Sequence, residues 1–158
     1  RKSLLTSIMK TDVYSLSREA TVEEAMRLFV EKNISAAPIV DESGEPVGFI
    51  SDGDILKRLS PRSNSFTDPI VLINSTVNDD EGYDEKLAKV MQMRASEIGA
   101  ASPICVSVHA NLTDVCRVLS ENHLKKVPVL EAGHIVGIIN RSDITHFSME
   151  KYLEERGA

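Results

Sequence analysis

Two stretches of the sequence read as two copies of one unit. Residues 22–59 are VEEAMRLFVEKNISAAPIVDESGEPVGFISDGDILKRL, and residues 112–147 are LTDVCRVLSENHLKKVPVLEAGHIVGIINRSDITHF. The offset is 90 and falls to 89 after a one-residue deletion opposite Ser43. Nine positions then coincide: Arg27/Arg117, Glu31/Glu121, Pro38/Pro128, Gly44/Gly133, Val47/Val136, Gly48/Gly137, Ile50/Ile139, Asp54/Asp143 and Ile55/Ile144. Self-similarity at a fixed spacing marks a repeat architecture, so we expect two divergent copies of one supersecondary unit.

Each copy has the pattern of a strand, a helix, two strands and a second helix. Thr21 and Glu24 match a capping box before the first helix, and Asn111 and Asp114 occupy the same places in the other copy. The expected strands cover 13–16, 37–40, 47–51, 104–108, 127–130 and 135–140. Short helices are expected to start near Asp52 and near Arg141.

The predicted fold class is therefore α/β (α+β), with two β-α-β-β-α repeats related by a pseudo-twofold axis. One unit of roughly 50 residues buries little surface, so the two copies are expected to share a core. A cleft between them is the expected place for a ligand, because ligand sites favour such interfaces.

We expect repeat one at 1–60, a long connection with a helix at 61–97, and repeat two with a C-terminal helix at 98–158. Within the connection, 69–73 fits a short strand or turn, 78–85 an exposed loop, and 84–97 a helix. That helix either introduces copy two, as 4–9 introduces copy one, or serves as a lid or partner contact, and we favour the first. The run 148–156 fits a packed helix or a linker.

Composition narrows the function classes. The chain has 158 residues, of which 42% are hydrophobic and 27% charged, as in globular proteins. Its net charge of -6 argues against a general nucleic-acid-binding surface. No apolar run approaches the roughly 20 residues of a membrane span, and no signal peptide is evident, so we expect a cytoplasmic protein without direct membrane insertion. The chain starts at Arg1, from which we expect a processed or cloned fragment.

Motifs for catalysis and metal binding are missing from the sequence. The four histidines are scattered, there is no CxxC pair, and neither a nucleophile elbow nor a Walker A motif occurs. Cys105 and Cys116 fall at apolar-patterned positions, where we expect buried thiols. We therefore expect no enzyme and no metal site.

The element order, the strand Ala37-Pro38-Ile39-Val40 and the run Gly48-x-Ile50-Ser51-x-x-Asp54-Ile55 resemble the CBS domain. The tandem arrangement is similar to a CBS pair, or Bateman module, over about residues 8–59 and 98–148. This resemblance implies regulation without a required cofactor. It implies a ligand such as AMP, ADP, ATP or S-adenosylmethionine, a homodimer, and an effector enzyme or transporter. Two alternatives stay open: an interaction module that has lost its ligand, and a regulatory fragment of a transporter or enzyme.

By the same resemblance, an aspartate at the end of a Gly-x-x-Ser/Thr-x-x-Asp run holds ribose. Copy one matches with Gly48, Ser51 and Asp54, whereas copy two has Asn140 before Asp143. A carboxylate can accept from both ribose hydroxyls, although Ser51 and Asp54 could instead only cap a helix. The walls around the base are expected from Val13, Ser15, Ile34 and Ala37 in copy one and Ile104, Val106, Leu124 and Val127 in copy two, with backbone groups near Ser15 and Cys105 at the adenine edge.

At the positions compared next, only copy two has cationic side chains that could bind a phosphate. Lys125, Lys126 and Arg141 stand where copy one has Ser35, Ala36 and Asp52. A charge about 6 Å from a phosphate is worth about 3 kcal/mol at an effective dielectric near 20. We expect a phosphorylated adenosine on Asp54 with these cations reaching across, and a less charged ligand or none on Asp143. If no contact crosses between the repeats, the assignment inverts, and the cations serve a ligand on Asp143. Exposed lysines can also contribute to solubility alone.

Overall fold

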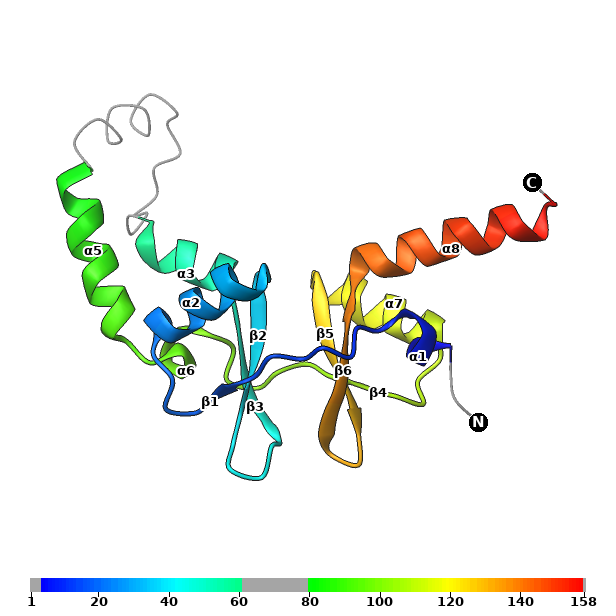
Figure 1. Cartoon of the computed structure of the whole chain (residues 1–158), viewed down its shortest axis with the longest axis horizontal. Coiled ribbons are helices and arrows are strands. Elements are labelled where there is room, and N and C mark those ends of the chain that lie inside the picture. Colours follow the sequence, from blue (N-terminus) through cyan, green and yellow to red (C-terminus); the bar gives the residue numbers. More distant parts are fainter. Residues whose placement is uncertain (1–3, 61–79, 158) are drawn as a thin grey trace. The chain divides into compact units, whose positions relative to one another are not determined.

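The computed structural model describes residues 4–60 and 80–157 and has the expected mixed α/β architecture (Figure 1). The chain divides into two compact units. One contains Ser15–Val40 and Val47–Ser102, and the other contains Arg1–Tyr14, Asp41–Pro46 and Pro103–Ala158. Each unit is built on a three-stranded sheet that corresponds to one sequence repeat.

The sheet of repeat one has the order β1 (Leu16–Ser17), β2 (Ala36–Val40), β3 (Pro46–Ser51). Strands β1 and β2 are parallel, with Leu16 opposite Ile39. Its helices are α2 (Val22–Lys32), α3 (Asp52–Leu59), α5 (Asp80–Gln92) and α6 (Ala95–Ile98). The predicted strand at 13–16 is wrong in its bounds, because ladder pairing with β2 begins only at Leu16.

Local signals set the ends of α2. The Thr21 hydroxyl accepts from the Glu24 N–H at 3.2 Å, and the Glu24 carboxylate accepts from the Thr21 N–H at 3.2 Å, which confirms the capping box. At the other end Asn33 takes the left-handed conformation, with φ 53°. Asparagine tolerates this conformation better than most residues, so the helix ends there.

The connection after repeat one packs on repeat one. Helix α5 contacts both α2 and α3 (Figure 1), and Val90 and Ala95 are buried in the same core as Phe29. Backbone bonds join Phe49 and Ala100 in both directions, at 3.0 and 2.8 Å. This helix thus precedes copy two in the chain, as 4–9 precedes copy one, but it packs on repeat one. The expected loop at 78–85 is wrong from Asp80 onward, since packing of Leu87 and Val90 stabilises a longer helix. The expected strand or turn at 69–73 lies outside the described residues.

The sheet of repeat two has the order β4 (Val106–Ser107), β5 (Lys126–Glu131), β6 (His134–Asn140). Strands β4 and β5 are parallel, whereas β5 and β6 are antiparallel with Val127 opposite Ile139. Its helices are α1 (Leu5–Ile8), α7 (Leu112–Glu121) and α8 (Arg141–Glu155). As in copy one, the first strand is shorter than expected and begins at Val106.

The first described residues of the chain pack on repeat two. Leu5 and Ile8 of α1 are buried in the same core as Val115, Val129 and Ile139. Lys10 and Ile138 exchange two backbone hydrogen bonds of 2.9 Å. The leading segment of each copy thus completes the core of the other copy. The predicted division at 1–60, 61–97 and 98–158 follows chain order, whereas this packing crosses it.

The last helix is longer than its counterpart in repeat one. Helix α8 is one continuous element of 15 residues that includes 148–155, so this run is helical, which is one of its two expected alternatives. Met149, Tyr152 and Leu153 on it are exposed. Over the described ranges, no helix combines the length and the apolar character that crossing a bilayer requires.

Candidate functional site

The start of α3 carries a closed hydrogen-bonded pair. Ser51 donates to Asp54 Oδ2 from its N–H at 2.9 Å and from its hydroxyl at 3.1 Å. The Asp54 N–H in turn donates to the Ser51 Oγ at 3.3 Å. The capping role foreseen for these two residues is thus present, and one carboxylate oxygen of Asp54 already has two donors.

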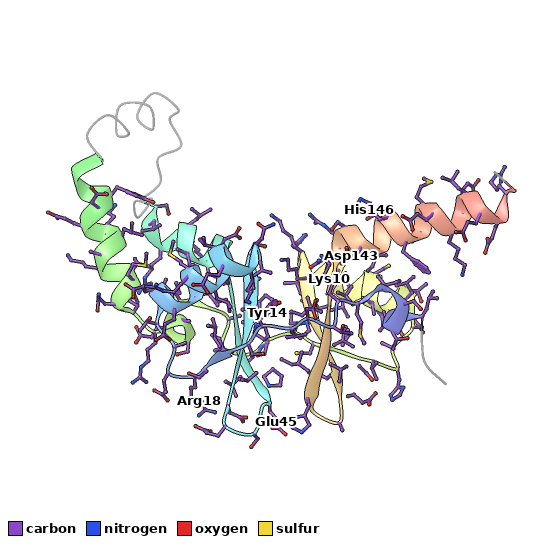
Figure 2. The ribbon with its side chains drawn as sticks, viewed as in Figure 1. Lys10, Tyr14, Arg18, Glu45, Asp143 and His146 are labelled. Atoms are coloured by element: carbon purple, nitrogen blue, oxygen red, sulfur yellow. The ribbon has the colours of Figure 1, made fainter. Side chains whose placement is uncertain are left out.

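The equivalent place at the start of α8 is open. Asn140 is the N-cap residue of α8 but makes no side-chain capping bond. Asn140 Oδ1 and Asp143 Oδ2 are both buried, and neither has a hydrogen-bond partner among the described residues. Asp143 lies where α8 leaves β6 (Figure 2). Two buried acceptors without donors are costly, at about 1–3 kcal/mol for each group, so this place is suited to a ligand that supplies donors.

Two predicted cations lie at the same end of repeat two. The Arg141 N–H donates to the Lys125 carbonyl at 2.7 Å, which ties the first residue of α8 to the residue before β5. The corresponding bond in repeat one joins Asp52 and Ser35 at 2.8 Å. The Lys125 and Arg141 side chains are exposed and pair with no acidic side chain that the structure describes. Lys126, half-buried at the start of β5, has an interaction of its own.

The structure divides the predicted base-binding walls between the two units. Ser15, Ile34 and Ala37 belong to the unit of repeat one, together with Ser51 and Asp54. Val13, Ile104 and Cys105 belong to the unit of repeat two, together with Lys125, Lys126, Asn140, Arg141 and Asp143. Ala37 and Val127 are 0% exposed and serve the two cores. Ser15 and Ile104 are exposed, whereas Val13, Ile34 and Cys105 are half-buried.

The two cysteines differ in environment. Cys105 is half-buried, its thiol donates to the Pro103 carbonyl at 3.7 Å, and burial raises the pKa of that thiol above its ordinary value. Cys105 is therefore protonated at neutral pH and a poor nucleophile. Cys116 is exposed, so the expectation of a buried thiol there is wrong. No group of three metal-ligating side chains gathers within 4–60 and 80–157.

A groove runs between α7 and α8 of repeat two, with a volume of about 600 Å³. It is lined by Cys116, Leu119, Ser120, His123, Arg141, Ile144, Thr145 and Ser148. The sequence patterns described above did not indicate this groove. A difference between the two copies could have indicated it. Copy two has the small polar residues Ser120, Thr145 and Ser148 where copy one has the apolar residues Val30, Leu56 and Leu59.

A family model described as CBS domain matches this chain twice, at residues 5–61 and 95–150. The CBS domain-containing protein CBSX1, chloroplastic, of Arabidopsis thaliana is 28% identical over 144 residues, which cover 89% of this chain. The chain spans 61% of the length of that relative.

Two solved structures share the fold. A crystal structure of CBSX2 in complex with AMP matches with a TM-score of 0.69 at 22% identity, covering 95% of this chain and 98% of that one. The CBS domain pair of protein MJ0100 in complex with 5′-methylthioadenosine and S-adenosyl-L-methionine also has a TM-score of 0.69 at 22% identity, covering 96% and 99%. At this identity the two likenesses show the fold alone.

Proposed function

This chain belongs to the CBS domain family, and from that premise we propose that it is a non-catalytic sensor of an adenosine-containing ligand. Repeat two would hold the ribose, and occupancy would be passed to an attached domain or a partner protein. The chain is further proposed to act as a homodimer in the cytoplasm. AMP, ADP, ATP and S-adenosylmethionine are the candidate ligands, and we propose no required cofactor.

One observation carries this proposal. Asn140 Oδ1 and Asp143 Oδ2 are buried without donors, whereas their counterparts Ser51 and Asp54 satisfy each other. A ribose offers two neighbouring hydroxyl donors, and a hydrogen bond to an ionised carboxylate is about twice as strong as one between neutral groups. The unpaired oxygens destabilise the protein alone and would be satisfied in its complex.

The charges at this end of repeat two favour a phosphorylated ligand. Lys125 and Arg141 are joined through their backbones beside the turn that carries Asp143, and both side chains are exposed. Copy one has Ser35 and Asp52 at these places. This arrangement supports the pairing in which the cations and the ribose aspartate belong to the same repeat. The experiment described below also tests the other pairing, in which the cations reach a ligand on Asp54.

Related structures support the ligand class. The CBSX2 crystal structure contains AMP, and the MJ0100 structure contains 5′-methylthioadenosine and S-adenosyl-L-methionine. All three compounds carry adenosine or a close derivative of it, and they differ in the group at the 5′ end. The cations near Asp143 favour the phosphate-bearing member of this set for the present chain.

The test is thermal unfolding with AMP, ADP, ATP, S-adenosylmethionine and 5′-methylthioadenosine, followed by calorimetric titration of the best ligand. A ligand that binds only the folded state stabilises it by about 2.7 kcal/mol at a hundredfold excess over Kd, which is a shift of several degrees for a chain of this size.

Asp143→Asn and Asp54→Asn are the matched variants, because each keeps the shape of its side chain. Loss of binding in Asp143→Asn alone supports the proposal, and loss in Asp54→Asn alone supports the pairing across repeats. Equal loss of binding in the two variants would contradict the proposed difference between the two repeats. No shift with any compound at millimolar concentration favours a CBS module that binds partners without a ligand.

A further inference from the structure

The leading segment of the chain places a lysine beside the candidate ribose site. Lys10 exchanges two backbone hydrogen bonds of 2.9 Å with Ile138 of β6, which lies two residues before Asn140 (Figure 2). Lys10 and Ile138 belong to the compact unit of repeat two, although Lys10 precedes copy one in the sequence. The Lys10 side chain is exposed and has no acidic partner among the residues that the structure describes.

The backbone pairing determines which face of the sheet this lysine shares. Residues directly opposite each other in an antiparallel pair have side chains on the same face, and so do alternate residues of one strand. Lys10 is opposite Ile138, and Asn140 follows Ile138 by two positions, so Lys10 and Asn140 share a face. Lys126 is opposite Asn140 and lies on that face too, whereas Ile139 is buried in the core on the other face. Asn140 therefore has a lysine on each of the two segments that flank β6.

The equivalent place in repeat one carries no cation. The backbone exchange of Lys10 and Ile138 corresponds to that of Ala100 and Phe49, at 3.0 and 2.8 Å. Lys10 beside the sheet of repeat two thus stands where the sheet of repeat one has Ala100. A comparison of the copies in chain order counts this lysine with copy one. The exchange of leading segments instead adds it to the cations of repeat two.

We propose that Lys10 is a specificity-determining residue of the Asp143 site, where its ammonium group binds the phosphate of a phosphorylated adenosine. This role rests on the proposed function and names the residue that selects among its candidate ligands. The ribose hydroxyls would satisfy the buried oxygens of Asn140 and Asp143, so the ammonium group is left for an acceptor. Its flexible four-carbon stem lets it reach a ligand that lies over this face of the sheet.

Phosphate is the acceptor that fits this cation best among the candidate ligands. A phosphate monoester carries a charge of about -1.5 to -2 at pH 7 and three strong acceptor oxygens. S-adenosylmethionine and 5′-methylthioadenosine have no phosphate, so Lys10 gives them no comparable attraction. The lysine therefore favours AMP, ADP and ATP over these two compounds.

The test compares AMP with adenosine by calorimetric titration of the full chain, because the two ligands differ only in the phosphate. Lys10→Met is expected to weaken AMP binding about tenfold, the effect of one charge near a phosphate at a partly solvated site, and to leave adenosine binding unchanged. Lys10→Arg keeps the charge and is expected to bind AMP as the wild type does. Lys89→Met is the matched control, since Lys89 is an exposed lysine on α5 in the other unit.

A second measurement is hydrogen exchange of the backbone amides at positions 10 and 138. AMP is expected to slow this exchange more than adenosine does in the wild type, because the phosphate holds the leading segment against β6. That difference is expected to disappear in Lys10→Met. Unchanged AMP binding in Lys10→Met overturns the proposal. An equal loss for AMP and adenosine also overturns it, because the substitution would then act through packing alone.

Asp143→Asn separates this proposal from the proposed function. If Asp143→Asn loses AMP binding while Lys10→Met keeps it, only the role of Lys10 is wrong. If Asp143→Asn keeps AMP binding, the ribose site is not at Asp143, and the proposed function is wrong in its site. A wild-type chain that binds neither AMP nor adenosine overturns both.

Discussion

At the scale of single residues, the two N-cap side chains explain why one repeat is closed and the other open. The Ser51 hydroxyl is both a donor and an acceptor, and it uses both capacities with Asp54. Asn140 stands at the same position in copy two, makes no capping bond, and leaves its own oxygen and one of Asp143 buried and unpaired. A single substitution between the copies thus separates a helix cap from a candidate ligand site.

This contrast predicts opposite effects of two alanine substitutions without ligand. Ser51→Ala is expected to lower the free energy of unfolding by about 1 kcal/mol, because it removes a helix cap. Asn140→Ala is expected to leave it unchanged or raise it, because it removes a buried unpaired oxygen. Chemical denaturation of the two variants measures both. If Asn140→Ala is as destabilising as Ser51→Ala, the Asn140 amide is bonded to Asp143 and the open site is refuted.

The turn between β5 and β6 supplies a second prediction at this scale. Ala132 and Gly133 both have positive φ, 51° and 82°, as in a type I′ hairpin turn. Alanine is strained there, whereas asparagine is favoured. Ala132→Asn is expected to raise the free energy of unfolding by about 1 kcal/mol, measured by denaturant titration. Ala101→Asn is the control, since Ala101 is exposed and has no positive φ. A larger gain in the control than at Ala132 would contradict this explanation.

At the scale of elements, the repeat made most of the fold predictable. Apolar periodicity located the helices that begin at Val22 and Leu112 and the strands around Pro38 and Pro128. The strand bounds were less accurate at β1 and β4, because only two residues of each pair in the ladder. The residue types at the start of α3 and α8 were also identified, but whether each pair is closed depends on side-chain hydrogen bonds that a sequence does not specify.

The exchange of leading segments could not be predicted. The pattern of Leu5 and Ile8, or of Val90 and Ala95, indicates that one face of each segment is buried. It does not indicate which copy buries it, because the two copies have nearly the same apolar pattern. Close backbone approaches settle the choice, and they depend on glycines: a side chain at Gly99 would meet Phe49, and one at Gly137 would meet Met9.

Gly99→Ala is therefore expected to be destabilising. A Cβ there would lie 2.5 Å from the Phe49 carbonyl oxygen and 3.2 Å from that of Ala95, and neither backbone group can move freely. We expect a loss of about 2–3 kcal/mol in the free energy of unfolding. Gly53→Ala in α3 is the matched control, since its nearest neighbour would be the Ser51 Oγ at 3.5 Å, and it is expected to be neutral or stabilising by up to about 1 kcal/mol. Equal effects of the two substitutions would show that space at Gly99 is not limiting.

At the scale of the whole molecule, neither repeat completes its own core. The core of repeat two includes Leu5 and Ile8 from the start of the chain, and the core of repeat one includes Val90 and Ala95 from the connection. A chain cut between the repeats would therefore leave an apolar core surface uncovered on each side.

The same exchange of leading segments predicts which strands lose protection from hydrogen exchange when one core residue is substituted. Leu5 is 0% exposed, so Leu5→Ala is expected to cost about 2–5 kcal/mol, whereas Leu4→Ala, at a site 41% exposed, is expected to change little. Hydrogen exchange should then increase first in β5 and β6, which follow Leu5 by more than a hundred residues, and not in β2 and β3 of the adjacent copy. Loss of protection in β2 and β3 instead would mean that the leading segment packs on its own copy. Loss confined to β5 and β6 would mean that the repeat carrying Asp143 depends on the packing of Leu5 and Ile8 for its stability.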